Sequence, residues 1–209
     1  MKNLLLSSAY FPPVSYFRLM VNYESATIEL FENYIKQTYR NRCLIYSEKG
    51  IMALSVPVIR GSFHKVPINE LKIDYSKNWQ RLHLRALDTA YNSSAYYEFY
   101  EDEIERLIME EHELLVDKNS DILKFITGSL EIDTRLSTTA SFVQSYDDAL
   151  DCRYTITPKK RKIRPLERGP EYFQVFGIEN GFIPDLSILD LLFNLGPEST
   201  ALLKSEIPS

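Results

Sequence analysis

The sequence predicts a mixed α/β fold around a Rossmann-like core, with a strand-rich N-terminal part and a helical middle. Three observations predict it. Short runs of aliphatic and aromatic residues, separated by turn residues, dominate residues 1–75. From Asn78 onward apolar residues recur at helical spacing, and near the C-terminus a short apolar segment stops at a Gly-Pro pair. Because no linker-like segment interrupts the chain, we expect residues 1–209 to form one domain.

The N-terminal part is expected to begin with a strand over residues 3–8. The chain then turns at Pro12–Pro13, because proline is excluded from the interior of a central strand. The segment VSYFRLMVNY, residues 14–23, predicts a short helix with Tyr16, Phe17 and Met20 on one side. Further strand-type segments lie at residues 26–35, at 42–47 and 51–59, which the turn EKG joins as a hairpin, and at 69–76.

The middle of the chain predicts three helices. The first follows Ser76 or Asn78 as its cap and carries a stripe that includes Trp79, His83 and Leu87. The second covers residues 94–115, with these side chains expected to face inward: Phe99, Ile104, Leu107, Ile108 and Leu115. The third is expected to start at Asn119 or Ser120. Extended segments are predicted at 135–144 and 152–160, a turn between Gly177 and Gly181, and an apolar helix at 185–195, followed by a final helical turn.

The overall charge argues against one class of function. The net charge is −5 with a pI near 5.3, which argues against nucleic-acid binding. Two runs depart from this balance: residues 98–121 hold ten Asp or Glu, and residues 159–168 hold six Lys or Arg. Each run is either a solvated face or an interface.

The N-terminus and the cysteines indicate the compartment. The apolar run NLLL is too short for a signal peptide, and no stretch reaches the length of a membrane span. Cys43 and Cys152 form no disulfide framework or metal-ligand pair, which suits a reducing compartment. We therefore expect a cytoplasmic protein without membrane contact, and no metal or cofactor.

Common catalytic motifs are absent from the sequence, which lacks GxSxG, GxGxxG, GxxxxGK[ST] and HExxH. Two clusters and the opening stretch remain as candidates. The segment FENYIKQTYRNRC, residues 31–43, gathers Lys, Arg and Asn suited to a carboxylate or phosphate. Trp79 and His83 share one helical face, so His83 is either a general base or a hydrogen-bonded core histidine. The rings in SSAYFPPVSYFRLM, residues 7–20, are either core or lining of a site.

Several segments together resemble the WbqC-like protein family, in the same order along nearly the whole chain. They are YFPPVSYF, FENYIKQTYRNRCLI, LSVPVIRG, WQRLHLRALDTAYNSSAYYEFY and FIPDLSILDLLFNLGPE. Members of the family typically open with a Gln-Pro-Tyr pattern and a later Gly. This chain has Ser8–Ala9 and Ser15 at those places, and a shorter segment over residues 150–175.

The resemblance implies a bacterial protein of O-antigen or amino-sugar biosynthesis that transfers an amino-acid or acyl group to a nucleotide-linked amino sugar. It implies that His83 is the general base, that arginine and lysine hold a diphosphate, and that rings stack on a base or sugar. The residues implied for the site are Tyr10, Pro12, Tyr16, Phe17, Lys36, Arg40, Asn41, Arg42, Trp79, His83, Pro184, Asp190 and Asn194. Of the opening residues we expect Pro12 and Phe17 to be structural and Tyr10 and Tyr16 to contact the ligand.

Two other interpretations stay open at this point. Because no complete catalytic set is present, the chain is alternatively a non-catalytic binding or scaffold protein for a nucleotide or sugar. The other interpretation is a structural protein that binds a partner, either a second copy or a pathway enzyme, through residues 98–121 or 159–164.

Overall fold

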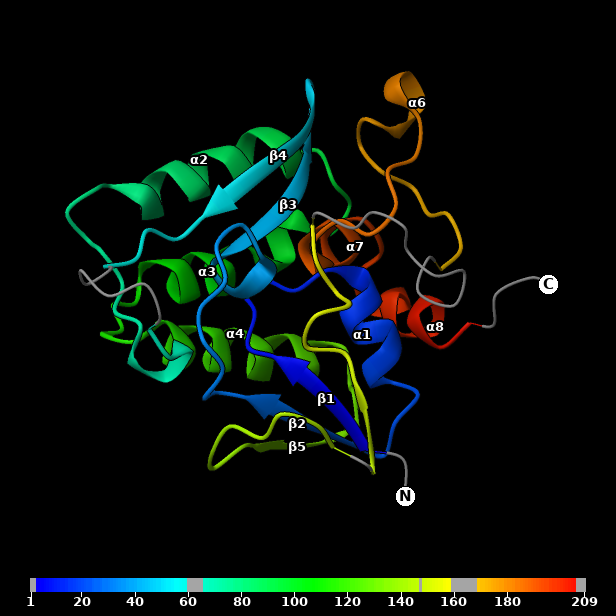
Figure 1. Cartoon of the computed structure of the whole chain (residues 1–209). Helices are drawn as coiled ribbons and strands as arrows, with labels where there is room; N and C mark the ends of the chain where they lie inside the picture. Colours follow the sequence, from blue (N-terminus) through cyan, green and yellow to red (C-terminus); the bar gives the residue numbers. More distant parts are fainter. Residues whose placement is uncertain (1–2, 60–65, 147, 159–168, 206–209) are drawn as a thin grey trace.

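The structure is a computed structural model and describes residues 3–59, 66–146, 148–158 and 169–205 (Figure 1). The basic run at 159–164 lies outside these residues. The strands are β1 (Asn3–Ser7), β2 (Ser25–Glu29), β3 (Arg42–Ser47), β4 (Gly50–Ser55), β5 (Arg135–Thr138) and β6 (Ala149–Asp151). The α-helices are α1 (Val14–Met20), α2 (Trp79–Tyr91), α3 (Tyr97–Met109), α4 (Leu115–Ser129), α6 (Gly177–Asn180), α7 (Ile188–Leu195) and α8 (Ser199–Lys204).

A parallel sheet with the strand order β5-β2-β1-β6 confirms the mixed α/β prediction. In its register Leu5 lies opposite Thr27 on one side and Asp151 on the other. The connection after β1 leads through α1 to β2, whereas β6 pairs with the opposite side of β1. All four strands run in the same direction, so their carboxyl ends share one edge, and β2 and β6 lie on opposite sides of β1.

The two faces of this sheet differ in polarity. Leu4, Leu6 and Ile28 are buried in the main core on the face that α1 and α4 cover (Figure 1). On the opposite face Asn3 donates to Thr27 Oγ1 at 3.3 Å, and Thr27 Oγ1 lies 3.1 Å from Ser137 Oγ. The second face is thus more polar than the first, although Leu5 and Glu29 on it are fully buried.

The predicted hairpin is confirmed, because β3 pairs antiparallel with β4, with Arg42 opposite Ser55 and Ser47 opposite Gly50. The predicted strand at 69–76 is wrong. The chain forms a 3₁₀ turn at Ile68–Glu70 and then only isolated bridges, from Ile73 to Val58 and from Lys72 to Leu114. The apolar residues of this segment, Leu71 and Ile73, are buried without a continuous strand partner.

The extended segment predicted at 152–160 is likewise displaced. The strand β6 ends at Asp151, and residues 153–155 form a turn. The Asp151 carboxylate accepts a hydrogen bond from the Arg153 backbone N–H at 3.0 Å, which closes this turn directly after the strand.

Helices α2, α3 and α4 confirm the helical middle, with two corrections. Phe99 was predicted to face inward but is 76% exposed, because Tyr97 and Tyr100 define the buried face of α3. The helix α4 starts at Leu115 rather than at Asn119 or Ser120, so the predicted second helix ends earlier, at Met109.

The end of α3 explains the break between the two helices. The buried side chain of Lys118, in the first turn of α4, donates from Nζ to the carbonyls of Leu107 at 2.7 Å and Glu110 at 2.6 Å. These carbonyls at the C-terminus of α3 have no partner within the helix, so the ammonium group satisfies them and fixes the angle between α3 and α4.

The C-terminal helix α7 is almost completely buried and confirms the predicted apolar helix that ends at Gly-Pro. Its N-cap Ser187 accepts from the N–H of Leu189, and the Ser187 hydroxyl donates to the carbonyl of Phe11 at 2.9 Å. These bonds join the start of α7 to the N-terminal turn.

Substitution of Gly196 is expected to be costly. Gly196 ends α7 with φ 54° and ψ −127°, and a Cβ there would lie 2.5 Å from Cδ1 of Tyr96. Gly196→Ala should lower the free energy of unfolding by about 2–4 kcal/mol through strain and overpacking. Gly128→Ala is the control, because Gly128 lies in α4 with nothing near its Cβ position. It should stabilise the protein by up to about 1 kcal/mol. Urea unfolding of both variants measures the difference, and equal stabilities would contradict it.

Candidate functional site

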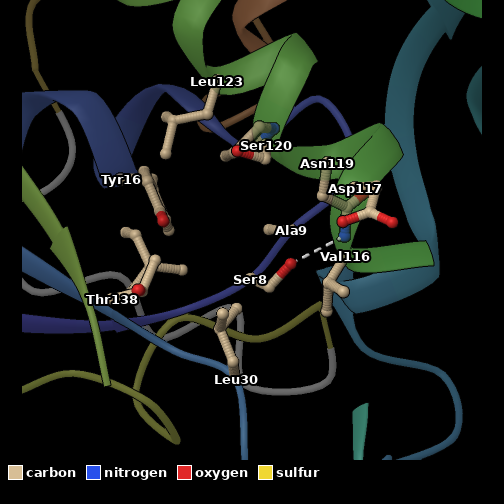
Figure 2. Close-up of a pocket in the computed structure, with 12 residues that line it drawn as sticks. Ser8, Ala9, Tyr16, Leu30, Val116, Asp117, Asn119, Ser120, Leu123 and Thr138 are labelled. Carbon is tan, nitrogen blue, oxygen red and sulfur yellow. Dashed lines mark hydrogen bonds between the residues drawn. The ribbon is translucent and has the colours of Figure 1, made fainter. Parts of the chain in front are cut away.

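A cavity of about 110 Å³ lies at the carboxyl ends of β1, β2 and β5, where they meet the first turns of α4 (Figure 2). We call it the strand-edge cavity. Its lining residues are Ser8, Ala9, Pro12, Tyr16, Ile28, Leu30, Val116, Asp117, Asn119, Ser120, Leu123 and Thr138. Ligands of open parallel sheets bind at this edge, because the loops that follow the strands carry adaptable side chains there.

One wall of the strand-edge cavity is polar and fixed. Asn119 Nδ2 donates to Ser8 Oγ at 3.0 Å and to the carbonyl of Arg40 at 2.9 Å, joining α4 to two N-terminal segments. Asn119 is buried, and its Oδ1 accepts no hydrogen bond from the residues that the structure describes. The opposite wall is aliphatic, from Ile28, Leu30 and Leu123. The cavity thus suits a small group with a polar and an apolar side.

Tyr16 separates this cavity from a smaller recess of about 10 Å³, which Tyr16, Arg40 and Arg153 line together with the ends of β1 and β6. The Tyr16 hydroxyl donates to the carbonyl of Ser7 at 3.1 Å. Burial raises the pKa of the Tyr16 phenol, with a smaller contribution from Glu32, so it stays protonated at neutral pH. Tyr16 is therefore held as a neutral donor between the two hollows.

Buried ion pairs fill the sheet edge between β1 and β6. Arg153 Nη1 lies 2.9 Å from Glu29 Oε2, and both side chains are fully buried. Arg153 Nη2 lies 2.6 Å from Asp151 Oδ2. Arg40 donates from Nε to Glu32 at 2.8 Å and from Nη2 to Ser7 Oγ at 2.9 Å. Three carboxylates against two guanidinium groups leave one net negative charge in this cluster.

Aromatic rings surround the outer side of Arg153. The ring centroids of Phe142, Tyr146 and Tyr154 lie 5.3, 5.5 and 5.6 Å from Arg153 Cζ. Tyr154 also lies 5.9 Å from Arg40 Cζ. Phe142 is 48% and Tyr154 47% exposed. The buried cations thus support a half-exposed aromatic surface, which we call the Arg153 ring surface.

The structure brings Tyr10, Trp79 and His83 together in the core, apart from the lining of the strand-edge cavity. Tyr10 OH lies 3.0 Å from His83 Nδ1, and the Trp79 ring packs at 5.1 Å against the imidazole. His83 is only 4% exposed, and burial is the main cause that lowers its pKa to about 4. The imidazole is therefore neutral at pH 7, and its function as a general base stays a prediction.

The pH dependence of stability should report this His83. Its pKa is about 6.5 in an unfolded chain and about 4 in the folded state, so folding disfavours the protonated form. The contribution of the neutral His83 to the free energy of unfolding is therefore fully present above pH ~6.5. It is lost as the pH falls toward 4. The stability advantage of wild type over His83→Gln should shrink by roughly 3 kcal/mol across this window. Urea unfolding at several pH values measures it, and a constant difference would contradict the buried neutral imidazole.

Asp190 and Asn194 belong to a separate buried cluster on α7. The Asp190 carboxylate accepts hydrogen bonds from Tyr91 at 2.9 Å, Tyr172 at 2.7 Å and Gln174 at 2.8 Å. Burial raises the pKa of Asp190 to about 6, and these hydrogen bonds limit the shift. Asn194 donates to the carbonyl of Asp190 at 2.7 Å. This cluster joins the C-terminal segments, and its ligand contacts stay predictions.

The other predicted residues are dispersed. Lys36 is exposed, whereas Asn41 is buried and donates to the carbonyl of Val56 at 2.7 Å. Arg42 is half-buried at the start of β3, and Phe17 is fully buried in the core. Pro184 is half-buried before α7. Of the predicted site residues, Pro12 and Tyr16 line the strand-edge cavity, and Tyr16 and Arg40 line the adjoining recess.

Sequence reasoning missed the residues that build this edge. In the sequence Ser8 stands out only as a departure from the family pattern, and Asn119 only as a candidate helix start. Nothing in the sequence alone singles out Thr138, Glu29 or Arg153. The sequence offered a signal only for Ser8, which ends the strand predicted at 3–8, whereas the strand ends at Glu29 and Asp151 appear only in the structure. Their convergence depends on strand order, which one sequence does not reveal.

An acidic cluster and a second hollow lie outside the strand-edge cavity. Ligand atoms of Glu110, His112 and Asp121 lie within 4.8 Å of one another, although Arg106 pairs with Glu110 and Lys124 with Asp121. A more open hollow of about 420 Å³ lies at the amino ends of β2 and β5. Among the described residues no helix is long and apolar enough to cross a membrane.

Comparisons with known proteins match this chain over most of its length. The sequence model of the WbqC-like protein family matches residues 7–163. A protein of Mycobacterium tuberculosis named "Uncharacterized protein Rv1507c" is 30% identical, over 97% of this chain and 97% of that protein. No solved structure matches the chain. The family match begins at the last residue of β1 and includes β2 to β6. It therefore includes every residue that lines the strand-edge cavity.

Proposed function

The chain belongs to the WbqC-like protein family, and from this membership we propose that it transfers an amino-acid or acyl group to a nucleotide-linked amino sugar. This reaction would serve the synthesis of surface polysaccharide such as O-antigen. The single observation that carries the proposal is the strand-edge cavity at the carboxyl ends of three parallel strands. We assign the reacting group of the ligand to this cavity.

The size and lining of the strand-edge cavity support a small transferred group. Its volume of about 110 Å³ is well below the roughly 300–1,000 Å³ of sites that enclose whole drug-sized ligands. A short acyl or aminoacyl group would place its aliphatic part against Leu30 and Leu123 and its polar part against Ser8. The nucleotide and most of the sugar would remain outside the cavity.

The reaction would be an acyl transfer from an activated ester or thioester. The sugar amine attacks the carbonyl carbon, an amide bond forms, and the alcohol or thiol of the donor leaves with the proton that the amine loses. Tyr16 would position the ligand through its ring and through its hydroxyl oxygen as an acceptor, because the hydroxyl proton is donated to Ser7. Arg40 would approach a phosphate only by exchanging part of its contact with Glu32, so the exposed Lys36 is the more accessible cation.

A non-catalytic binding function is the second candidate, and one observation favours it. The only histidine among the predicted site residues, His83, is buried and bonded to Tyr10, and it does not line the strand-edge cavity. Under this candidate His83→Gln retains both ligand affinity and pathway output. A transferase that uses His83 as its base, as the family resemblance implies, would instead lose product formation in His83→Gln and retain affinity.

The direct test combines binding with product analysis. Calorimetry with a panel of nucleotide-linked amino sugars should find at least one ligand, and mass spectrometry should then find the amide product when an acyl or aminoacyl thioester is added. Binding without product from any donor would favour the non-catalytic function. The absence of binding to the whole panel would contradict both candidates.

A further inference from the structure

We infer that the two half-exposed rings of the Arg153 ring surface, Phe142 and Tyr154, stack against the base of a nucleotide. The identity of the remaining ligand, an amino sugar, rests on the proposed function, whereas the stacking itself does not. Both rings are about half exposed. They follow β5 and β6 at the carboxyl edge of the parallel sheet, which is the edge where such sheets bind ligands. Bulky aromatic rings in such a place are efficient contacts for planar ligands.

The rings are held in place before any ligand binds. The Arg153 guanidinium beneath them is fixed by Asp151 and Glu29, and it also donates to the carbonyls of Val143 at 2.9 Å and Gln144 at 3.1 Å. These two carbonyls belong to the same segment as Phe142, so the segment is tied down next to its exposed ring. A preorganised ring loses little conformational freedom when a base stacks on it.

The charge around the Arg153 ring surface favours binding of an uncharged ligand ring over binding of an anion. The ion pairs beneath the rings carry one net negative charge, and the guanidinium groups of Arg40 and Arg153 are already engaged by carboxylates. A phosphate would therefore meet no unpaired arginine of this cluster. An uncharged aromatic base needs none, because stacking depends on the π face and is tolerant of base identity.

The position of the ring surface relative to the cavity fits a ligand with two ends. Tyr154 lies beside Arg40, and Arg40 lines the recess that shares Ser8, Ala9 and Tyr16 with the strand-edge cavity. A nucleotide-linked sugar with its base on the rings would thus have its sugar on the side of the strand-edge cavity, outside the recess of about 10 Å³.

The test uses uridine and adenosine 5′-monophosphates and ribose 5-phosphate as probes on the full chain. Wild type should bind both nucleotides more tightly than ribose 5-phosphate. Phe142→Ala should weaken nucleotide binding about tenfold and leave ribose 5-phosphate binding unchanged, as expected for the loss of one stacking contact. Phe142→Leu keeps an apolar side chain without a flat ring and should behave like Phe142→Ala. Phe99→Ala, which removes an exposed ring from α3, is the matched control and should bind like wild type.

Three results would overturn the inference: no preference of wild type for nucleotides, wild-type affinity in Phe142→Ala, or full affinity in Phe142→Leu. Thermal unfolding checks that each variant is folded. The proposed function fails separately, if the nucleotides bind in this pattern but no amino sugar is acylated. Conversely, acylation with unchanged nucleotide affinity in Phe142→Ala would overturn the inference and leave the proposed function standing.

Discussion

Replacement of Arg153 by methionine is expected to lower the free energy of unfolding by about 3–5 kcal/mol. The reason is the position of its partners. Glu29 is fully buried and would lose the cation that faces it, and Asp151 would lose its closest partner. The two carbonyls of the segment after β5 would also lose their donor. Urea unfolding followed by circular dichroism measures the change.

A second substitution separates the ion pair from simple loss of packing. Glu29→Gln in the Arg153→Met background removes the uncompensated charge, so the double variant should recover part of the lost stability. Glu29→Gln alone should be destabilising. Strictly additive effects of the two substitutions, or a loss below about 1 kcal/mol in Arg153→Met, would contradict the assignment of a coupled buried pair.

Ser120→Phe is expected to weaken binding of the nucleotide-linked amino sugar at least about tenfold and to abolish transfer. Ser120 is exposed on α4 and lines the strand-edge cavity, so a phenyl ring there fills the cavity without entering the core. A ligand whose acyl group cannot enter the cavity loses the contacts made there. A tenfold loss of affinity corresponds to about 1.4 kcal/mol of binding free energy.

Lys124→Phe provides the matched control for Ser120→Phe. Lys124 lies one helical turn further along α4, is exposed, and does not line the cavity. Its pair with Asp121 is exposed and contributes little to stability. Lys124→Phe should therefore bind and react like wild type. Equal effects of the two substitutions would show that an added ring on α4, and not the filled cavity, is responsible.

The fold could be predicted from local patterns wherever one pattern dominated. The hairpin of β3 and β4 follows from two strand-type runs around a short turn, and α7 follows from an apolar run before Gly196. The start of α4 was placed too late because Asn119 and Ser120 look like caps. In the folded chain the N–H of Leu115 instead bonds to the carbonyl of Leu71, a contact between segments far apart in sequence.

The candidate site was less predictable, since its parts come from four separate segments. Tyr16 was selected for its ring and does line the strand-edge cavity, and Arg40 lines the adjoining recess. Asn119 and Arg153 were missed because their partners, Ser8 and Glu29, are brought near them only by the strand order β5-β2-β1-β6. Helical spacing correctly joined Trp79 and His83 on one face, but it does not show whether that face meets a ligand.

The central claim is that the strand-edge cavity receives the reacting part of the ligand. A titration of ¹⁵N-labelled protein with the bound nucleotide-linked amino sugar, followed by two-dimensional NMR, tests it most directly. We predict that the amide signals of Ser8, Thr138 and residues 116–120 shift the most. Largest shifts at Asp190 and its neighbours on α7, or at the amino ends of β2 and β5, would contradict the claim.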